Sequence, residues 1–253
     1  MDAETKPLVE RISLLKVPLD IVPQEHLPDR IFQLLNSEKG ENIVLLSLWD
    51  LLKARRNREY RSFITSASLV IPISKSLVGG AKFLTGKTPV RYMPFDFIVN
   101  LLTILENREF SAYLLGGKQK VLKKTEKNIR QTFPHLRVVG RYPGGFKRQE
   151  EALLFLSIRK TAPSLLLVGK GVKGGEWWIA RNSSQLNRGL RLWCSDLYDV
   201  FAKRRRHPSR GVFDNGLEWI GFCCRNPLLV FRLFPYLRYK FLLLFYKLSK
   251  KNG

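Results

Sequence analysis

Two glycine-rich turns are the parts of this sequence best suited to hold a phosphate group. Gly116-Gly117 follows the apolar run at residues 111–115, and a second turn at residues 169–176 follows the apolar run at 164–168. Glycine allows backbone N–H groups to approach a ligand closely, and a helix that begins at the turn adds the positive end of its dipole. The turns match neither a Walker loop nor the dinucleotide-binding fingerprint. Because a tight strand-to-helix connection also needs glycine, a phosphate site and a purely structural role both stay open.

Two acidic residues are candidates for acid–base chemistry. Asp96 and Glu176 each stand near the start of a segment with helical periodicity. A carboxylate in this position can remove a proton from a hydroxyl group, or it can stabilise the positive end of the helix dipole. The residues alone do not decide between these roles. The three histidines lack the i, i+4 spacing of a metal site, so we expect no metal ion.

The elements that must position these residues alternate between short apolar strands and amphipathic helices. Alternation with short connections predicts an α/β fold, a Rossmann-like parallel sheet with helices on both faces. Ligands of such sheets bind beyond the carboxyl ends of the strands, so we expect both glycine turns to line one cleft there. We predict strands at residues 42–48, 69–71, 111–115, 136–139 and 164–168, and helices at 50–66, 95–106, 118–133 and 149–158, with a break at Gly79-Gly80.

The composition favours a packed core and an anionic partner. Hydrophobic residues make up 45% of the 253 residues, which excludes disorder over the whole length. The 44 Lys and Arg residues exceed the 21 acids by 23 charges. Nucleic acid, anionic lipid and phosphorylated substrates all fit this excess, although no aromatic–basic RNA motif is present and we expect no nucleic-acid partner. Three cysteines form no disulfide framework, so a reducing compartment is expected.

The C-terminal residues 201–253 differ from the rest of the chain. They carry twelve Lys and Arg residues and two acids. On a helix, basic residues would gather opposite Leu and Phe, which is typical of a helix at the boundary of an anionic membrane. A buried helix or a dimer contact is the alternative, and it leaves a homo-oligomer open. We therefore expect an α/β domain at 1–200, with an N-terminal extension at 1–40, and a basic membrane-associating appendage at 201–253. The basic face comprises Arg232, Lys240, Lys247, Lys250 and Lys251.

Several motifs, taken in order, resemble those of the WecG/TagA/CpsF glycosyltransferases. The central block reads LLGG at 114–117, FPHLRVVG at 133–140 and GGF at 144–146. The family has LGG, YP-x-L-x-I-V-G and GYF in this order and spacing. Similarity continues at 67–72, 91–96, 176–182 and 216–219, so that it covers about residues 40–232. On these motifs the chain is identified as a member of that family.

The resemblance implies an activity and a set of partners. Family members transfer an N-acetylated aminosugar, commonly N-acetylmannosamine, from a UDP-sugar to a polyprenyl-diphosphate-linked acceptor in cell-surface polysaccharide biosynthesis. The implied reaction is inverting and needs no metal or other cofactor. The implied location is cytoplasmic, with peripheral attachment to the anionic inner face of the cell membrane. The implied nucleotide-sugar contacts are Arg91, Asp96, Gly116, Gly117, Gly169, Gly171 and Glu176, and Arg206 joins the basic face in contacting the membrane or the lipid diphosphate.

One departure from the family pattern bears directly on catalysis. The family's catalytic base is the Asp of a P-D-G motif, whereas this chain reads Pro72-Ile73-Ser74. Isoleucine cannot accept a proton, so transfer would need another carboxylate, with Asp96 and Glu176 as the candidates. The family's T-x-N motif likewise falls on residues 45–47, which read Leu-Leu-Ser. Two hypotheses follow: a glycosyltransferase with an altered base, or a non-catalytic homologue that acts as a membrane-surface binding or partner protein.

Overall fold

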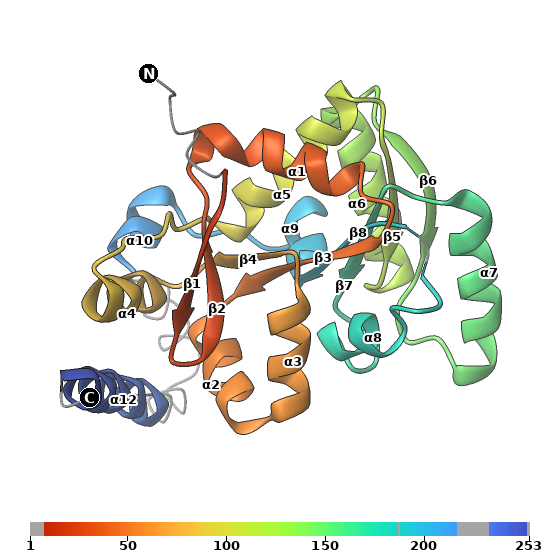
Figure 1. Ribbon diagram of the computed structural model, residues 1–253. Coiled ribbons are helices and arrows are strands. Elements are labelled where there is room, and N and C mark those ends of the chain that lie inside the picture. The colour runs from red at the N-terminus through yellow and green to blue at the C-terminus, as the bar shows by residue number, and fades with distance from the viewer. Residues whose placement is uncertain (1–7, 187, 217–232, 252–253) are drawn as a thin grey trace, which may run out of the picture.

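Six parallel strands form the central sheet, in the order β4-β3-β8-β7-β5-β6 (Figure 1). The computed structural model describes residues 8–186, 188–216 and 233–251. Near-continuous apolar runs such as LLLVG in β7 are required in a parallel sheet, because both faces are covered. The predicted α/β fold is confirmed. The strands are β3 (Gly40–Leu46), β4 (Leu69–Pro72), β5 (Ser111–Leu115), β6 (Arg137–Tyr142), β7 (Leu165–Gly169) and β8 (Gly189–Ser195).

Helices cover both faces of this sheet, and side chains alternate between the two layers. In β3, Ile43 and Leu45 pack into one core cluster, whereas Val44 and Leu46 pack into the other. The first layer contains α1 (Leu27–Leu35), α5 (Pro94–Asn107), α6 (Gln119–Thr132) and α9 (Leu197–Phe201). The second contains α2 (Leu48–Arg56), α3 (Arg58–Ser66), α4 (Lys75–Thr85), α7 (Glu151–Thr161) and α8 (Glu176–Arg181). Short 3-10 helices, η1 (Gln24–His26) and η2 (Arg148–Glu150), precede α1 and α7.

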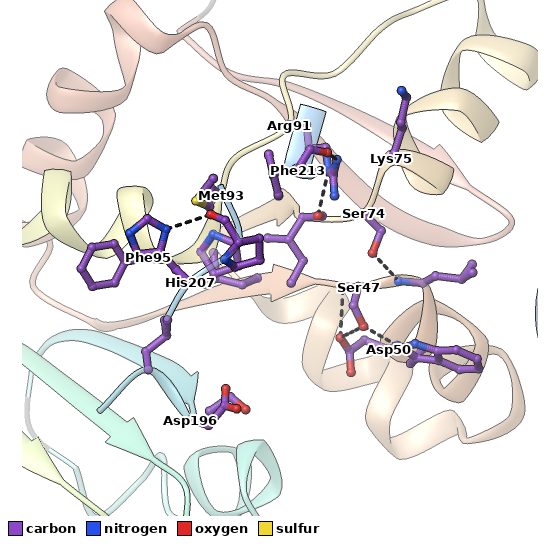
Figure 2. Close-up of a pocket in the computed structure, with 18 of the residues that line it drawn as sticks. Ser47, Asp50, Ser74, Lys75, Arg91, Met93, Phe95, Asp196, His207 and Phe213 are labelled. Atoms are coloured by element: carbon purple, nitrogen blue, oxygen red, sulfur yellow. Dashed lines mark hydrogen bonds between the residues drawn. The ribbon is translucent and has the colours of Figure 1, made fainter. Parts of the chain in front are cut away.

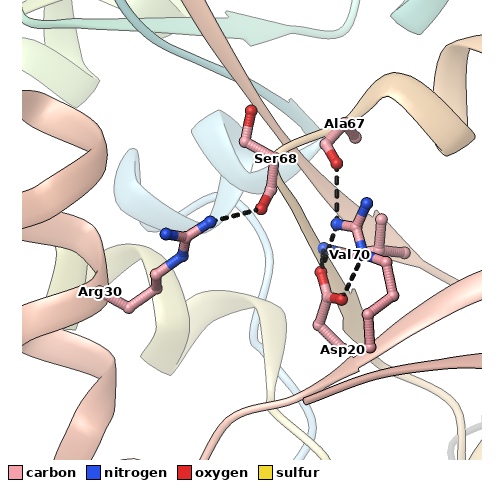
Figure 3. Close-up of polar contacts among 6 residues, drawn as sticks. Asp20, Arg30, Ala67, Ser68 and Val70 are labelled. Carbon is pink, nitrogen blue, oxygen red and sulfur yellow. Dashed lines mark hydrogen bonds and ion pairs between the residues drawn. The ribbon is translucent and has the colours of Figure 1, made fainter. Parts of the chain in front are cut away.

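An N-terminal hairpin, β1 (Glu10–Leu14) and β2 (Val17–Ile21), is attached to the sheet through one buried carboxylate (Figure 3). Asp20 is 1% exposed and accepts hydrogen bonds from Arg11 Nε at 2.7 Å, from Arg11 Nη2 at 2.8 Å and from the Val70 backbone N–H at 2.7 Å. Arg11 Nη2 also donates to the Ala67 carbonyl oxygen at 2.8 Å. The hairpin is therefore fixed to the start of β4 by a charge-assisted network.

The predicted helix at 50–66 is wrong, because Asn57 divides it into α2 and α3. Asn57 has extended backbone, with φ −118° and ψ 113°, and its side chain accepts a hydrogen bond from the Tyr60 N–H at 2.8 Å. Asn is among the best N-cap residues, and it ends one helix here while starting the next. The other predicted strands and helices agree with the structure to within three residues.

The predicted break at Gly79-Gly80 is also wrong, because both glycines lie inside α4. The C-terminal helix α12 (Leu233–Lys251) crosses α4 at this point, and a Cβ atom at Gly80 would overlap the Tyr239 hydroxyl group. Tyr239 is buried and donates to the Ser76 carbonyl oxygen at 2.8 Å. Gly80 is thus required for close helix packing, and it does not end the helix.

Alanine substitutions at the neighbouring residues Gly79 and Gly80 should have different effects. Gly79 has no atom near its Cβ position, so Gly79→Ala is expected to stabilise the protein by about 0.5–1 kcal/mol through helix propensity. Gly80→Ala gains the same propensity but forces Tyr239 away, so hydrogen exchange in α12 should accelerate. Thermal unfolding and hydrogen exchange measure both effects. Equal exchange in α12 for the two variants would contradict this account of the packing.

The central strand β8 and several short elements were not predicted. β8 lies between β3 and β7, yet its sequence GLRLWCS contains Arg191 and Trp193 and so lacks a clear apolar run. Arg191 is 5% exposed. The other unpredicted elements are β1, β2, η1, α1, α4, α8, α9 and α10 (Arg210–Asn215).

Candidate functional site

A cavity of about 1230 Å³ lies at the carboxyl ends of β3, β4 and β8. The chain runs from β3 to β4 on one side of the sheet, and the later strands lie on the other side of β3. Open parallel sheets bind ligands at such a change of direction. The volume exceeds that of a typical small-molecule pocket, about 300–1,000 Å³, and could hold a nucleotide-sugar together with part of a second substrate.

Positive side chains outnumber carboxylates around this cavity. The excess favours an anionic ligand such as a diphosphate, whose charge these groups could balance. Arg206, expected at the lipid diphosphate, is among them, as is Lys240 of α12. The lining cations are Lys53, Lys75, Arg91, Arg205, Arg206 and Lys240, and the lining carboxylates are Asp50, Glu176 and Asp196.

Two serines at the strand ends serve to start α2 (Figure 2). Ser47, at the end of β3, accepts the Asp50 N–H at 3.3 Å, and Asp50 Oδ2 accepts the Ser47 N–H at 2.9 Å, which completes a capping box. Ser74, at the end of β4, accepts the Leu48 N–H through its Oγ at 3.1 Å. These bonds join the ends of β3 and β4 and fix Asp50 at the cavity wall.

Glu176, on α8, is a partly buried carboxylate at the same wall. The Tyr60 hydroxyl group donates to its Oε2 atom and also lies 3.2 Å from Asp50 Oδ1. Burial, followed by the negative charge of Asp50, raises the pKa of Glu176 to about 7. The hydrogen bond from Tyr60 and the charge of Lys53 act in the opposite direction. A carboxylate with such a pKa can accept a proton near neutral pH.

The two glycine turns lie together at the expected edge of the sheet. The Gly117 N–H donates to the Lys170 carbonyl oxygen at 2.5 Å, and the Gly145 N–H donates to the Gly171 carbonyl oxygen at 2.8 Å. A Cβ atom at Gly116 would come within 2.5 Å of the Gly169 carbonyl oxygen, so the backbones require glycine in order to pack this closely. Of these turns, residues 174–176 line the large cavity, whereas Gly116, Gly117, Gly169 and Gly171 lie outside its lining. The prediction that both turns line one cleft is therefore not met by this cavity.

The candidates Ile73, Arg91 and Asp96 lie in different places relative to the cavity. Ile73 lines the cavity at the end of β4, and its carbonyl oxygen accepts a hydrogen bond from Arg91 Nε at 3.0 Å. Arg91 also donates to the Phe213 carbonyl oxygen and lies over the Phe213 ring, 3.6 Å from its centroid. It therefore connects β4 to α10. Asp96, in the first turn of α5, lies outside the lining, 3.7 Å from Arg210 Nη2.

Several residues of this region were missed in the sequence, including Asp50, Tyr60 and Asp196. Ser47 and Asp50 have capping-box spacing, which is a readable signal of a helix start. Asp196 follows the unpredicted strand β8 and forms an ion pair with Arg205. The His207 ring stacks on Phe95 with 5.0 Å between centroids, and both residues line the cavity, so the segment after α9 borders it (Figure 2).

The helix α12 presents two different faces. Tyr239 and Leu243 are buried against the second layer, and Tyr236 and Lys240 line the cavity. Arg232 lies outside the described residues, and Lys250 and Lys251 belong to the last turn of α12. In the described part of the chain, no helix is long and apolar enough to cross a membrane. The opposite face is more than half exposed and consists of Phe234, Leu237, Phe241, Leu244, Phe245 and Leu248.

Comparison with known proteins agrees with the motifs. The pattern of the "Glycosyl transferase WecG/TagA/CpsF family" matches residues 12–253. A curated relative from Bacillus spizizenii, an N-acetylglucosaminyldiphosphoundecaprenol N-acetyl-beta-D-mannosaminyltransferase, is 21% identical over 193 residues, which cover 76% of this chain and 74% of that protein. The family match extends over nearly the whole chain and includes both the cavity and α12. This chain therefore belongs to the WecG/TagA/CpsF family of glycosyltransferases.

Proposed function

We propose that this protein transfers an N-acetylated aminosugar from a UDP-sugar to a polyprenyl-diphosphate-linked acceptor at the inner face of the cell membrane. The observation that carries the proposal is the cation-lined cavity at the carboxyl ends of β3, β4 and β8, in a chain that belongs to a glycosyltransferase family. The relative's name supplies the chemistry of the proposed substrates, N-acetylmannosamine as the sugar and a lipid-diphosphate N-acetylglucosamine as the acceptor.

The cavity suits a displacement in which UDP is the leaving group. A departing diphosphate gains negative charge, and lysine and arginine side chains can stabilise that charge without a metal ion. Lys75 begins α4, and Arg91 and Arg206 come from two other segments, so cations approach the cavity from several sides. The acceptor hydroxyl group would attack the anomeric carbon from the opposite side, which inverts its configuration.

We further propose that residues 201–253 form an appendage that attaches the 1–200 domain to an anionic membrane. The exposed face of α12 consists of Phe and Leu, and Arg238, Lys240 and Lys247 on the same helix are exposed cations. Such a helix lies in the headgroup region with its apolar face buried. Because Tyr236 and Lys240 border the cavity, this placement would bring the cavity mouth near a lipid-linked acceptor.

The membrane proposal predicts that serines on the exposed face of α12 weaken vesicle binding. In Phe241→Ser/Phe245→Ser the two replaced side chains are 70% and 59% exposed, so folding should be unaffected. The proposal places both phenyl groups in the apolar part of the membrane, so their loss should weaken vesicle binding at least about tenfold. Flotation with phosphatidylglycerol vesicles measures it. Leu153→Ser, on α7 and 65% exposed, is the matched control and should bind like the wild type. Equal flotation of all three proteins would contradict the proposal.

The transfer activity itself is tested with UDP-N-acetylmannosamine and a short-chain polyprenyl-diphosphate N-acetylglucosamine. We expect a disaccharide-lipid product, detected by mass spectrometry, and UDP binding detected by calorimetry. The second candidate function, a non-catalytic membrane-surface protein, is favoured by the hydrocarbon side chain of Ile73 at the cavity. Absence of both product and UDP binding would support that candidate and contradict the transferase.

A further inference from the structure

A pair of carboxylates shares one tyrosine hydroxyl group at the wall of the cavity. Tyr60, on α3, is fully buried, and its hydroxyl group contacts Glu176 Oε2 on α8 and lies 3.2 Å from Asp50 Oδ1 on α2. Both carboxylates line the cavity. The consecutive helices α2 and α3 and the distant helix α8 therefore hold Glu176 in one position at the edge of the ligand space.

The contacts of the three lining carboxylates distinguish their roles. Asp50 accepts the Ser47 N–H and hydroxyl group through Oδ2, at 2.9 and 2.5 Å, and thereby caps α2. Asp196 is neutralised by its ion pair with Arg205. Glu176 is held through Oε2 by the neutral hydroxyl group of Tyr60. Of the three, Glu176 is the one that can take up a proton without breaking a helix cap or an ion pair.

We propose that Glu176 is the proton acceptor of the transfer reaction, with Tyr60 and Asp50 as its positioning residues. This inference rests on the proposed function. As the acceptor hydroxyl oxygen bonds to C1 of the donor sugar, its proton moves to Oε1 of Glu176. The bond between C1 and the diphosphate oxygen breaks, and its electron pair leaves with UDP. One C–O bond forms, one breaks, and the proton stays on the carboxylate until solvent removes it.

Amide substitution tests the assignment directly. Glu176→Gln keeps the shape of the side chain and an oxygen for Tyr60 but removes the base, so kcat should fall by about 10²–10⁴-fold, while UDP binding stays within about twofold of the wild type. Glu151→Gln is the matched control. Glu151 accepts the Trp178 Nε1–H of α8 at 3.1 Å, lies outside the cavity lining, and keeps an acceptor oxygen as Gln. Its transfer rate should match the wild type.

The pH dependence provides a second test that a structural role would not reproduce. The described titratable groups that act on Glu176 are Asp50 and Lys53 on α2 and Tyr60 on α3. A general base works when ionised, so wild-type transfer should rise with pH through a midpoint near 7. Asp50→Asn removes a neighbouring negative charge and should move the midpoint to lower pH. Tyr60→Phe removes a hydrogen bond to the ionised form and should move it to higher pH.

Opposite shifts in these two variants, together with the loss of rate in Glu176→Gln, support the assignment. Transfer by Glu176→Gln at the wild-type rate overturns it and leaves the proposed function intact. Shifts of the same sign in Asp50→Asn and Tyr60→Phe also overturn it. A wild type that binds UDP but forms no product at any pH overturns both the assignment and the proposed function.

Discussion

Transfer by the Glu176→Gln protein is expected to recover when Ile73 is replaced by Asp. Ile73 and Glu176 line the same cavity, and Ile73 lies at the end of β4, where the resemblance locates the base of the family. An added carboxylate there should accept the acceptor proton and restore on the order of 10²-fold of the lost rate. Initial rates of product formation at pH 8, well above the ordinary pKa of an aspartate, measure the recovery.

The matched control for this rescue is Ile73→Asn in the same background. Asparagine has the size and polarity of Asp but cannot act as a general base near neutral pH, so its rate should stay at that of Glu176→Gln. Equal recovery by Asp and Asn would mean that the rescue comes from the polarity or the smaller size of the new side chain, and it would contradict the base assignment. A wild type without activity that becomes active as Ile73→Asp would instead favour the non-catalytic homologue.

Removing the buried carboxylate of the N-terminal hairpin is expected to destabilise the whole protein. Asp20→Ala leaves the Val70 N–H and the Arg11 guanidinium without their shared acceptor (Figure 3). The Arg11 side chain is 40% exposed and can partly rehydrate, so the expected loss in free energy of unfolding is about 2–4 kcal/mol. Urea unfolding measures it as a lower midpoint at unchanged slope.

A surface ion pair of the same hairpin provides the comparison. Glu10 pairs with Lys87, and both side chains are about half exposed, at 44% and 50%. Solvent screens such pairs, so Glu10→Gln should change the free energy of unfolding by less than about 1 kcal/mol. If Asp20→Ala were as mild as Glu10→Gln, the hairpin would not be fixed to β4 by Asp20 as described.

Local patterns in the sequence were sufficient to predict most strands of the central sheet. β5 and β7 are continuous apolar runs, and the segments after them are glycine turns, so their place in a parallel sheet could be predicted. β8 could not be predicted, because Arg191 and Trp193 interrupt its apolar pattern, although the strand lies in the middle of the sheet. Its neighbours, which bury it on both sides, come from distant parts of the chain.

The site was predicted less completely, for the same physical reason. Glu176 was a candidate from its own segment, but Tyr60, its partner, is 116 residues away in the sequence. The Gly79-Gly80 pair is typical of a helix break, and only the packing of Tyr239 from α12 against Gly80 explains why the pair lies inside a helix. Contacts between such distant segments depend on the whole fold, and no local spacing encodes them.

A crystal structure of the full chain with UDP tests the central claim most directly. We expect the diphosphate in the cavity at the carboxyl ends of β3, β4 and β8, among the cations contributed by Lys75, Arg91 and Arg206. Glu176 should lie across the space for the donor sugar from the β-phosphate. UDP bound on another surface, such as the basic face of α6 and β6 near Lys127 and Arg141, would contradict it.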